Sequence, residues 1–143
     1  MKKKYIVSLI FLLLLAFTSS VFASFNLDTT RWTWVGSNSN YGLFIDSKTI
    51  KPLYGNKIEF WVCSYHNENC KFHNIGEHYD YYLVVIDYNK NSGCLKSIFT
   101  LDSNKNVIEK ENYNNYNYEP ILPGSDGECI ADAAYLLVYG SAR

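Results

Sequence analysis

The sequence lacks an excess of basic residues. It has 13 Lys and Arg against 14 Asp and Glu in 143 residues, and no run of basic residues lies beyond the N-terminus. Binding to a phosphate backbone needs a dense basic surface, so we expect no nucleic-acid partner. A chain of this length is enough for one domain with a real hydrophobic core.

A second long apolar run is also missing. The first one, Tyr5–Phe17, follows the basic segment Met1–Lys4, and the small residues Val21 and Ala23 precede a cleavage-like position. This pattern predicts a signal peptide over residues 1–23 and a mature domain over residues 24–143. The alternative is an uncleaved anchor, but a run of 13 residues falls short of the roughly 20 needed to span a bilayer.

Cleavage of the signal peptide would set the charge and the location of the mature chain. Loss of Lys2, Lys3 and Lys4 leaves ten basic residues against 14 acidic ones, a charge of about −4. The first cysteine is Cys63, which excludes lipid attachment at the cleavage point. The expected location is the periplasm, the outer cell surface or the medium, without a membrane span in the mature chain.

Enzyme signatures are absent as well. Ser125 stands between Gly124 and Gly127 without the strand-to-helix pattern of a nucleophile elbow, and a helix-capping role explains it. Three aspartates each end an expected strand beside turn residues, where side-chain to backbone bonding is usual; these are Asp46, Asp87 and Asp102. We therefore expect no enzymatic activity and no cofactor.

Cysteine is scarce, with four residues in the chain. In an exported protein, four cysteines predict two disulfides with three possible connectivities. A two-residue turn after Tyr65 would place Cys63 directly opposite Cys70, within reach of a bridge. This pairing leaves Cys94 for Cys129, so we predict the bridges Cys63–Cys70 and Cys94–Cys129.

The same region contains histidines that bear on metal binding. By residue type, Cys63, Cys70, His73 and His78 could form a Cys2His2 zinc site. Oxidation of the two thiols in an exported chain argues against it, so we predict no metal and keep His73 and His78 as the candidate ligands of the alternative.

Strand formers dominate the rest of the mature chain. Short turns separate these strands, which predicts an antiparallel meander. In Lys57–Tyr65 the alternation places Phe60 and Val62 toward the core and Trp61 on the other face. The Asn- and Tyr-rich segment 111–119 is compatible with a strand or a loop. The expected strands are 32–35, 41–46, 57–65, 79–88, 94–101 and 107–110.

One helix is expected near the C-terminus. Ser125 followed by Glu128 is a capping box, and apolar residues then recur at helical spacing. The apolar face must pack on the sheet, which gives an α+β fold of about five to seven strands and one helix. This face comprises Ile130, Ala133, Ala134, Leu137 and Val138.

Aromatic residues are abundant, with 20 in the mature chain. They exceed what one small core can bury, and exposed aromatic patches mark binding sites. The alternative is that tyrosines line the solvent face of the sheet because of their strand propensity. The candidate binding surface consists of Trp32, Trp34, Trp61, Tyr113, Tyr116 and Tyr118.

Several short motifs resemble the surface-adhesin protein E-like domain family of bacteria. They cover nearly the whole mature chain and consist of Trp34-Val35-Gly36, Tyr41–Ser47 with Ile50, Ile58–Val62, Tyr88 with the turn after it, and Ile121–Ser125 before the final helix. The resemblance implies a curved antiparallel sheet with the C-terminal helix on one face. It also implies binding to host matrix or serum proteins and allows a homodimer.

The expected function is therefore an exported, non-enzymatic binding module that acts as a surface adhesin. Two alternatives remain at this point. One is a periplasmic structural or envelope protein without a host ligand, and the other is a zinc-binding domain.

Overall fold

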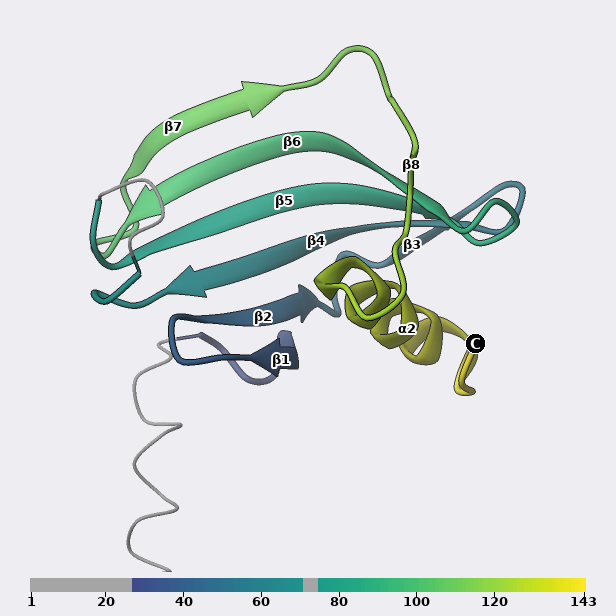
Figure 1. Ribbon diagram of the computed structural model, residues 1–143, viewed down its shortest axis with the longest axis horizontal. Helices are drawn as coiled ribbons and strands as arrows, with labels where there is room; N and C mark the ends of the chain where they lie inside the picture. Colours follow the sequence, from purple (N-terminus) through teal and green to yellow (C-terminus); the bar gives the residue numbers. More distant parts are fainter. Residues whose placement is uncertain (1–26, 71–74) are drawn as a thin grey trace, which may run out of the picture.

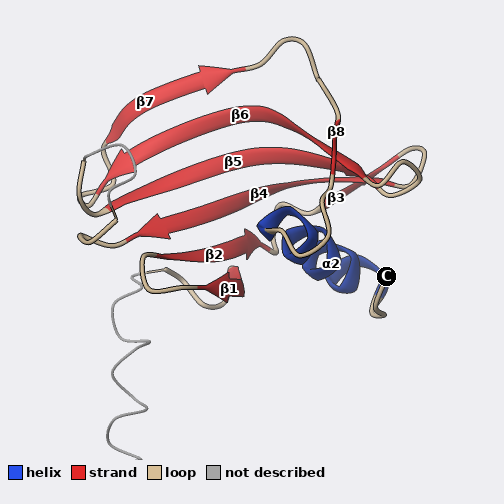
Figure 2. Ribbon diagram, viewed as in Figure 1, coloured by secondary structure: helices blue, strands red, loops and turns tan. Residues whose placement is uncertain are grey.

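The computed structural model describes residues 27–70 and 75–143. The expected signal peptide, its cleavage site and His73 lie outside the described residues. The described elements are eight strands and one helix (Figures 1 and 2): β1 (Trp32–Ser37), β2 (Tyr41–Asp46), β3 (Lys51–Leu53), β4 (Lys57–His66), β5 (His78–Asp87), β6 (Ser92–Asp102), β7 (Val107–Asn112), β8 (Glu119–Pro120) and α2 (Asp126–Tyr139).

All strands belong to one antiparallel sheet with the order β1-β2-β4-β5-β6-β7. Strand β3 pairs with β4 beside β2, and β8 pairs with β6. Figure 1 shows the central strands curving along their length, with the helix against one side of the sheet. The predicted α+β fold, an antiparallel sheet with one C-terminal helix packed on it, is confirmed.

Strand β3 was not expected from the sequence, and β8 begins in the segment that was compatible with a strand or a loop. Strand β3 contains Pro52. Because proline has no N–H to donate, it is typical of turns and is tolerated in a sheet only at an edge or a bulge. Segment 111–119 combines both predicted alternatives: β7 ends at Asn112, an irregular stretch follows, and β8 begins at Glu119.

Strands β4 and β5 form the longest unbroken pairing, from Lys57 opposite Asp87 to His66 opposite His78. Side chains alternate between the two faces of this ribbon. Ile58, Phe60 and Val62 are at most 1% exposed and pack with the helix. The core face predicted for β4 is therefore confirmed.

Helix α2 approaches the sheet through small residues. Ala131 and Ala134 are fully buried, and Ile130, Ala133 and Val138 pack against the same core. Leu137 was predicted on the buried face, but it is 42% exposed. The prediction was too broad by this one residue, because Val138 and not Leu137 packs against the core in the last turn of the helix.

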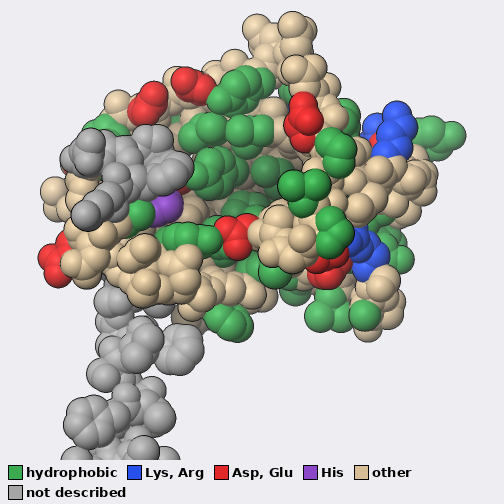
Figure 3. Space-filling model, in the orientation of Figure 1, with side chains coloured by type: hydrophobic (Ala, Val, Ile, Leu, Met, Phe, Trp, Pro, Cys, Tyr) green, Lys and Arg blue, Asp and Glu red, His purple; other side chains and the backbone are tan. Residues whose placement is uncertain are grey.

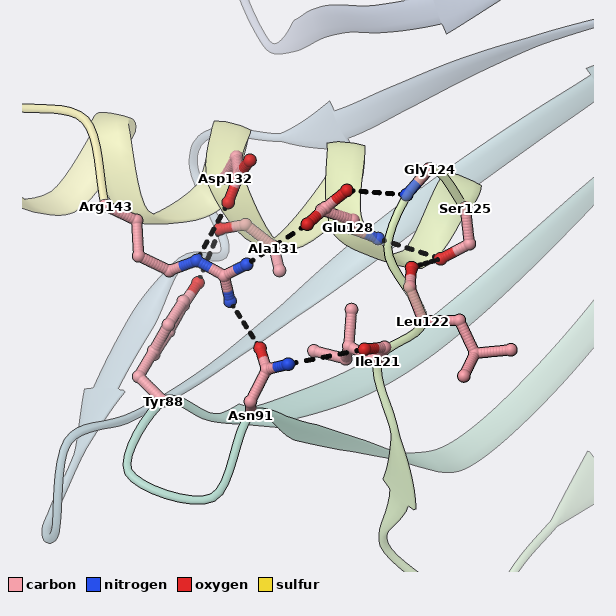
Figure 4. Close-up of polar contacts among 10 residues, drawn as sticks. All are labelled: Tyr88, Asn91, Ile121, Leu122, Gly124, Ser125, Glu128, Ala131, Asp132 and Arg143. Atoms are coloured by element: carbon pink, nitrogen blue, oxygen red, sulfur yellow. Dashed lines mark hydrogen bonds and ion pairs between the residues drawn. The ribbon is translucent and has the colours of Figure 1, made fainter.

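The helix begins with the predicted capping box, in a slightly different form (Figure 4). Ser125 Oγ accepts a hydrogen bond from the Glu128 amide at 3.3 Å. Glu128 Oε2 accepts from the amide of Gly124 at 2.7 Å, one residue earlier than the capping pattern predicts. The first contact satisfies a donor of the first turn, and the second ties Glu128 to the residue before the N-cap.

A second set of contacts joins the helix to the β5–β6 turn, and Figure 4 shows both sets. Tyr88 Oη donates to the carbonyl of Ala131 at 2.7 Å, which ties the middle of the helix to the end of β5. Arg143 bridges Asp132, at 2.9 Å, and the Asn91 side chain, also at 2.9 Å. The helix position is thus set by polar contacts on one side and by apolar packing on the other.

We predict that Ser125→Ala lowers the free energy of unfolding by about 1 kcal/mol, because the substitution removes a helix N-cap. Chemical denaturation followed by circular dichroism measures the change. Ser125→Asp, which also caps helices, should keep most of the stability. Equal unfolding midpoints for wild type and Ser125→Ala would contradict the capping role.

Candidate functional site

Two histidines meet where β4 ends and β5 begins. His66 and His78 are directly opposite in the register, and their rings stack with centroids 4.4 Å apart at an interplanar angle of 6°. Asp80 follows His78 by two residues, so it points to the same face of the sheet. All three side chains are buried, with exposures of 7%, 0% and 1%.

The Asp80 carboxylate faces both imidazoles. Its Oδ2 lies 3.3 Å from His66 Nε2 and 3.7 Å from His78 Nε2. The other oxygen, Oδ1, accepts a hydrogen bond from Thr100 Oγ1 at 2.6 Å, and Tyr82 Oη donates to Oδ2 at 3.1 Å. We call the set of His66, His78 and Asp80 the His–His–Asp cluster.

Two opposing effects act on the pKa of Asp80. Burial raises the pKa of Asp80. Hydrogen bonds from His66 and Thr100, together with the nearby imidazoles, lower it by more than burial raises it, so the pKa lies below its ordinary value. Asp80 is therefore held as a carboxylate at neutral pH. For Tyr82, burial and the Asp80 charge both raise the pKa of the phenol, so it remains a hydrogen-bond donor.

The other nitrogen of each imidazole is also engaged. His78 Nδ1 lies 2.6 Å from the carbonyl oxygen of Gly76; because a carbonyl only accepts, Nδ1 carries the proton. His78 Nε2, the other ring nitrogen, faces Asp80 Oδ2 at 3.7 Å. His66 Nδ1 lies 3.2 Å from Cys70 Sγ, and its Nε2 lies 2.9 Å from Ser64 Oγ.

A pocket of about 630 Å³ lies beside the cluster, and this volume is typical of small-ligand sites. Figure 3 shows histidine at one end of a stretch of hydrophobic side chains on this side of the molecule. Tyr41 Oη donates to Asp126 Oδ2 at 2.6 Å, which joins β2 to the start of the helix across the pocket. The lining comprises Asn40, Tyr41, Leu43, Val62, Ser64, His66, Cys70, Tyr82, Asp126 and Ile130.

The cluster is compatible with two chemistries. Two imidazoles and a carboxylate are ligands that divalent transition metals accept, and the candidate ligand atoms all lie within 4.8 Å of one another. Alternatively, Cys70, His66 and Asp80 form a thiol–imidazole–carboxylate series like that of cysteine nucleophiles. The two uses require opposite tautomers of His66, because each needs a different ring nitrogen to be unprotonated.

The cysteines do not adopt the predicted pairing, and all four are free thiols. Cys63 is opposite Tyr81 in β5, not opposite Cys70. Its side chain also leaves β4 on the face opposite to His66, the residue that Cys70 contacts. The predicted Cys63–Cys70 bridge fails because the chain turns at residues 67–70, after His66, rather than at His66-Asn67.

The second predicted bridge fails for a similar reason. Cys94 is opposite Val85, which alternates with the core residues Val84 and Ile86 and so points away from the helix. Cys129 is exposed on α2. The sheet itself separates the two sulfur atoms.

The face of the sheet opposite to α2 is rich in aromatic side chains. One row of directly paired residues crosses six strands, and paired residues share a face. We call this side of the sheet the aromatic face. The row runs through Trp34, Phe44, Cys63, Tyr81, Phe99 and Lys110.

Edge-to-face contacts organise these rings. Trp32 contacts Tyr81 with centroids 5.5 Å apart, and Trp61 contacts Phe99 at 5.7 Å. They border a pocket of about 420 Å³ that also includes Leu101 and Val107. The structure therefore brings the predicted binding residues Trp32 and Trp61 together. Trp34 lies in the row described above and is 52% exposed.

The three candidate tyrosines lie apart from these tryptophans. Tyr116 lies under Lys96 Nζ at 5.2 Å, and Tyr118 lies under Lys57 Nζ at 4.9 Å. Tyr113 Oη donates to a carboxylate oxygen of Glu111. The six residues of the predicted binding surface therefore divide into a tryptophan group on the sheet and a tyrosine group in the segment after β7.

Sequence reasoning found one member of the His–His–Asp cluster, His78, and missed His66 and Asp80. The spacing His78-x-Asp80 in a strand was a usable signal, since it places both side chains on one face. His66 could be added only with the β4–β5 register. His73, the other predicted candidate, lies outside the described residues.

Comparison with protein-family models, with curated proteins and with solved structures finds no match for this chain. Within residues 27–70 and 75–143, no helix is both long and apolar enough to cross a membrane. The chemistry of the two faces of the sheet is therefore the basis for a functional proposal.

We predict that the four thiols react at very different rates. Burial raises the pKa of the Cys63 thiol to about 12, so Cys63 should resist alkylation in the native state, whereas the exposed Cys129 should react quickly. Timed labelling with iodoacetamide followed by peptide mapping measures both rates. Recovery of Cys94 linked to Cys129 would refute the free-thiol arrangement.

We predict that Thr100→Val lowers the free energy of unfolding by about 1–3 kcal/mol at neutral pH, because a buried carboxylate oxygen loses its hydrogen-bond donor. The folded pKa of Asp80 lies below the ordinary 3.8. Its stabilising effect is thus present above about pH 4 and lost as pH falls through the folded pKa. The difference between variant and wild type should shrink in acid. Thr33→Val, in β1, is the matched control, and an equal loss in both variants would contradict the prediction.

Proposed function

We propose that this chain is an exported, non-enzymatic binding module that contacts host matrix or serum proteins through its aromatic face. The observation that carries the proposal is the pocket between Trp32 and Trp61 on the side of the sheet that α2 does not cover. Tryptophan, tyrosine and arginine are enriched among the residues that dominate protein–protein binding energy.

Packing gives this face the rigidity that a binding surface needs. Phe44, Cys63, Tyr65 and Tyr79 are buried beneath it, with Trp32 and Tyr81 packed against them. Arg31 is fixed at the rim by Asp46, with Nη2 2.6 Å from Oδ2. Side chains held in this way lose little entropy on binding, which favours affinity.

The charges on this face favour an acidic partner. Lys105 Nζ lies 2.9 Å from the centroid of Tyr79, and Lys110 Nζ lies 5.0 Å from that of Phe99. Neither lysine forms an ion pair with a described residue. The expected partner surface therefore combines apolar side chains for the tryptophan pocket with carboxylates for the two lysines.

Export and surface exposure belong to the same proposal, and the predicted signal peptide supports them. The rival is an envelope protein without a host ligand. Protease treatment of intact cells that express the full chain separates the two, because an adhesin must be cleaved from outside. A chain that is protected until the cells are lysed would refute the adhesin function.

Binding of the mature chain to immobilised matrix and serum proteins tests the ligand class. We predict that Trp61→Ala weakens binding at least about tenfold, which corresponds to about 1.4 kcal/mol. Lys110→Glu should also weaken binding, and added salt should lower wild-type affinity through screening of the charges.

Tyr54→Ala is the matched control. Tyr54 is fully exposed in the β3–β4 turn, so its removal deletes an exposed aromatic ring without touching the aromatic face. Equal affinities of wild type, Trp61→Ala and Lys110→Glu would refute this face as the binding site. Absence of binding to every protein in the panel would refute the function itself.

A further inference from the structure

We infer that the His–His–Asp cluster is a binding site for one divalent transition-metal ion of the zinc type, with His66 Nε2, His78 Nε2 and an Asp80 oxygen as its ligands. The inference concerns the helix side of the sheet and is independent of the aromatic face.

The separations of the ligand atoms suit such an ion. Zinc binds nitrogen and oxygen at about 2.0–2.2 Å in a tetrahedron, so neighbouring ligand atoms lie about 3.4 Å apart. Asp80 Oδ2 lies 3.3 Å from His66 Nε2 and 3.7 Å from His78 Nε2. The two rings are stacked at an interplanar angle of 6°, so binding of one ion requires them to tilt until both Nε2 atoms face it.

Neighbouring groups also orient the side chains of the proposed ligands. Metal-binding histidines usually donate their second N–H to a carbonyl or carboxylate, which orients the ring and makes it a stronger ligand. His78 Nδ1 donates to the Gly76 carbonyl at 2.6 Å. Thr100 Oγ1 holds the other Asp80 oxygen at 2.6 Å. The Cys70 sulfur at His66 Nδ1, 3.2 Å away, lies on the far side of the ring from the ligand atom.

The presence of His78 favours a metal over a cysteine nucleophile. A thiol–imidazole–carboxylate series uses one imidazole and one carboxylate. Here a second imidazole is stacked on the first and aimed at the same carboxylate oxygen. A metal site uses both rings, and its positive charge offsets the burial of the Asp80 carboxylate.

Among residues 27–70 and 75–143, three side chains are placed to bind the ion, which leaves a fourth position for an external ligand. His66, Ser64 and Tyr82 border the 630 Å³ pocket, which places that position toward the pocket. Three protein ligands with one open position are typical of zinc sites that bind water or an external anion. We therefore expect the bound ion to accept a small anionic ligand, such as a carboxylate, from the pocket.

Zinc titration of the metal-free mature chain, by calorimetry and elemental analysis, tests the inference. We expect one zinc ion per chain. Loss of a ligand in His78→Ala or Asp80→Asn should weaken binding by at least about 100-fold, because loss of an outer-shell partner alone costs about 10–100-fold. Asp132→Asn, which alters a carboxylate on the exposed side of α2, and Cys129→Ser should bind as wild type does.

X-ray absorption at the zinc edge of the wild-type complex keeps the inference testable if a variant fails to fold. The expected first shell contains two imidazole nitrogens and oxygen, without sulfur. Sulfur in the first shell would assign the ion to a cysteine site instead. Absence of stoichiometric zinc, or unchanged affinity in His78→Ala, would also overturn the inference.

Discussion

The pairing of β4 with β5 is the constraint on which the other features depend. Its register is unbroken from Lys57 opposite Asp87 to His66 opposite His78. Because side chains alternate along a strand, a slip of one residue would exchange the two faces of the ribbon. The same register places Phe60 under the helix, Cys63 on the aromatic face, and His66 beside His78.

The two faces of the sheet are covered in different ways. On the helix side, Ala131 and Ala134 seal the core at one end, and the other end contains buried polar groups that need partners inside the protein. The Asp80 network supplies those partners. On the opposite side, no helix of the described residues packs on the sheet, and aromatic rings cover it by packing on one another and on cations. The two proposed binding sites follow from this difference and do not share a surface.

Local patterns predicted the fold well and the sites only in part. The alternation of side chains in Lys57–Tyr65 and the capping box at Ser125 each depend only on residues close together in the sequence. Both could therefore be predicted from the sequence alone. The disulfides depended on which strand lies opposite Cys63 and on which face Cys94 occupies, and neither is a local property. His66 was missed for the same reason: it lies 12 positions before His78 in the sequence, and only the pairing of two strands brings the two together. Asp80, two positions after His78, had a local signal that the prediction did not use. Resemblance to a family predicted the same curved sheet and did not bear on either site.

The β4–β5 register can be measured directly by nuclear Overhauser contacts between backbone protons of the mature chain in solution. The structure predicts cross-strand contacts between Cys63 and Tyr81 and between Tyr65 and Tyr79. Contacts displaced by one residue, with Cys63 facing Tyr82, would turn His66 and Asp80 to opposite faces. That result would contradict the division of the sheet into a metal-binding side and an aromatic side.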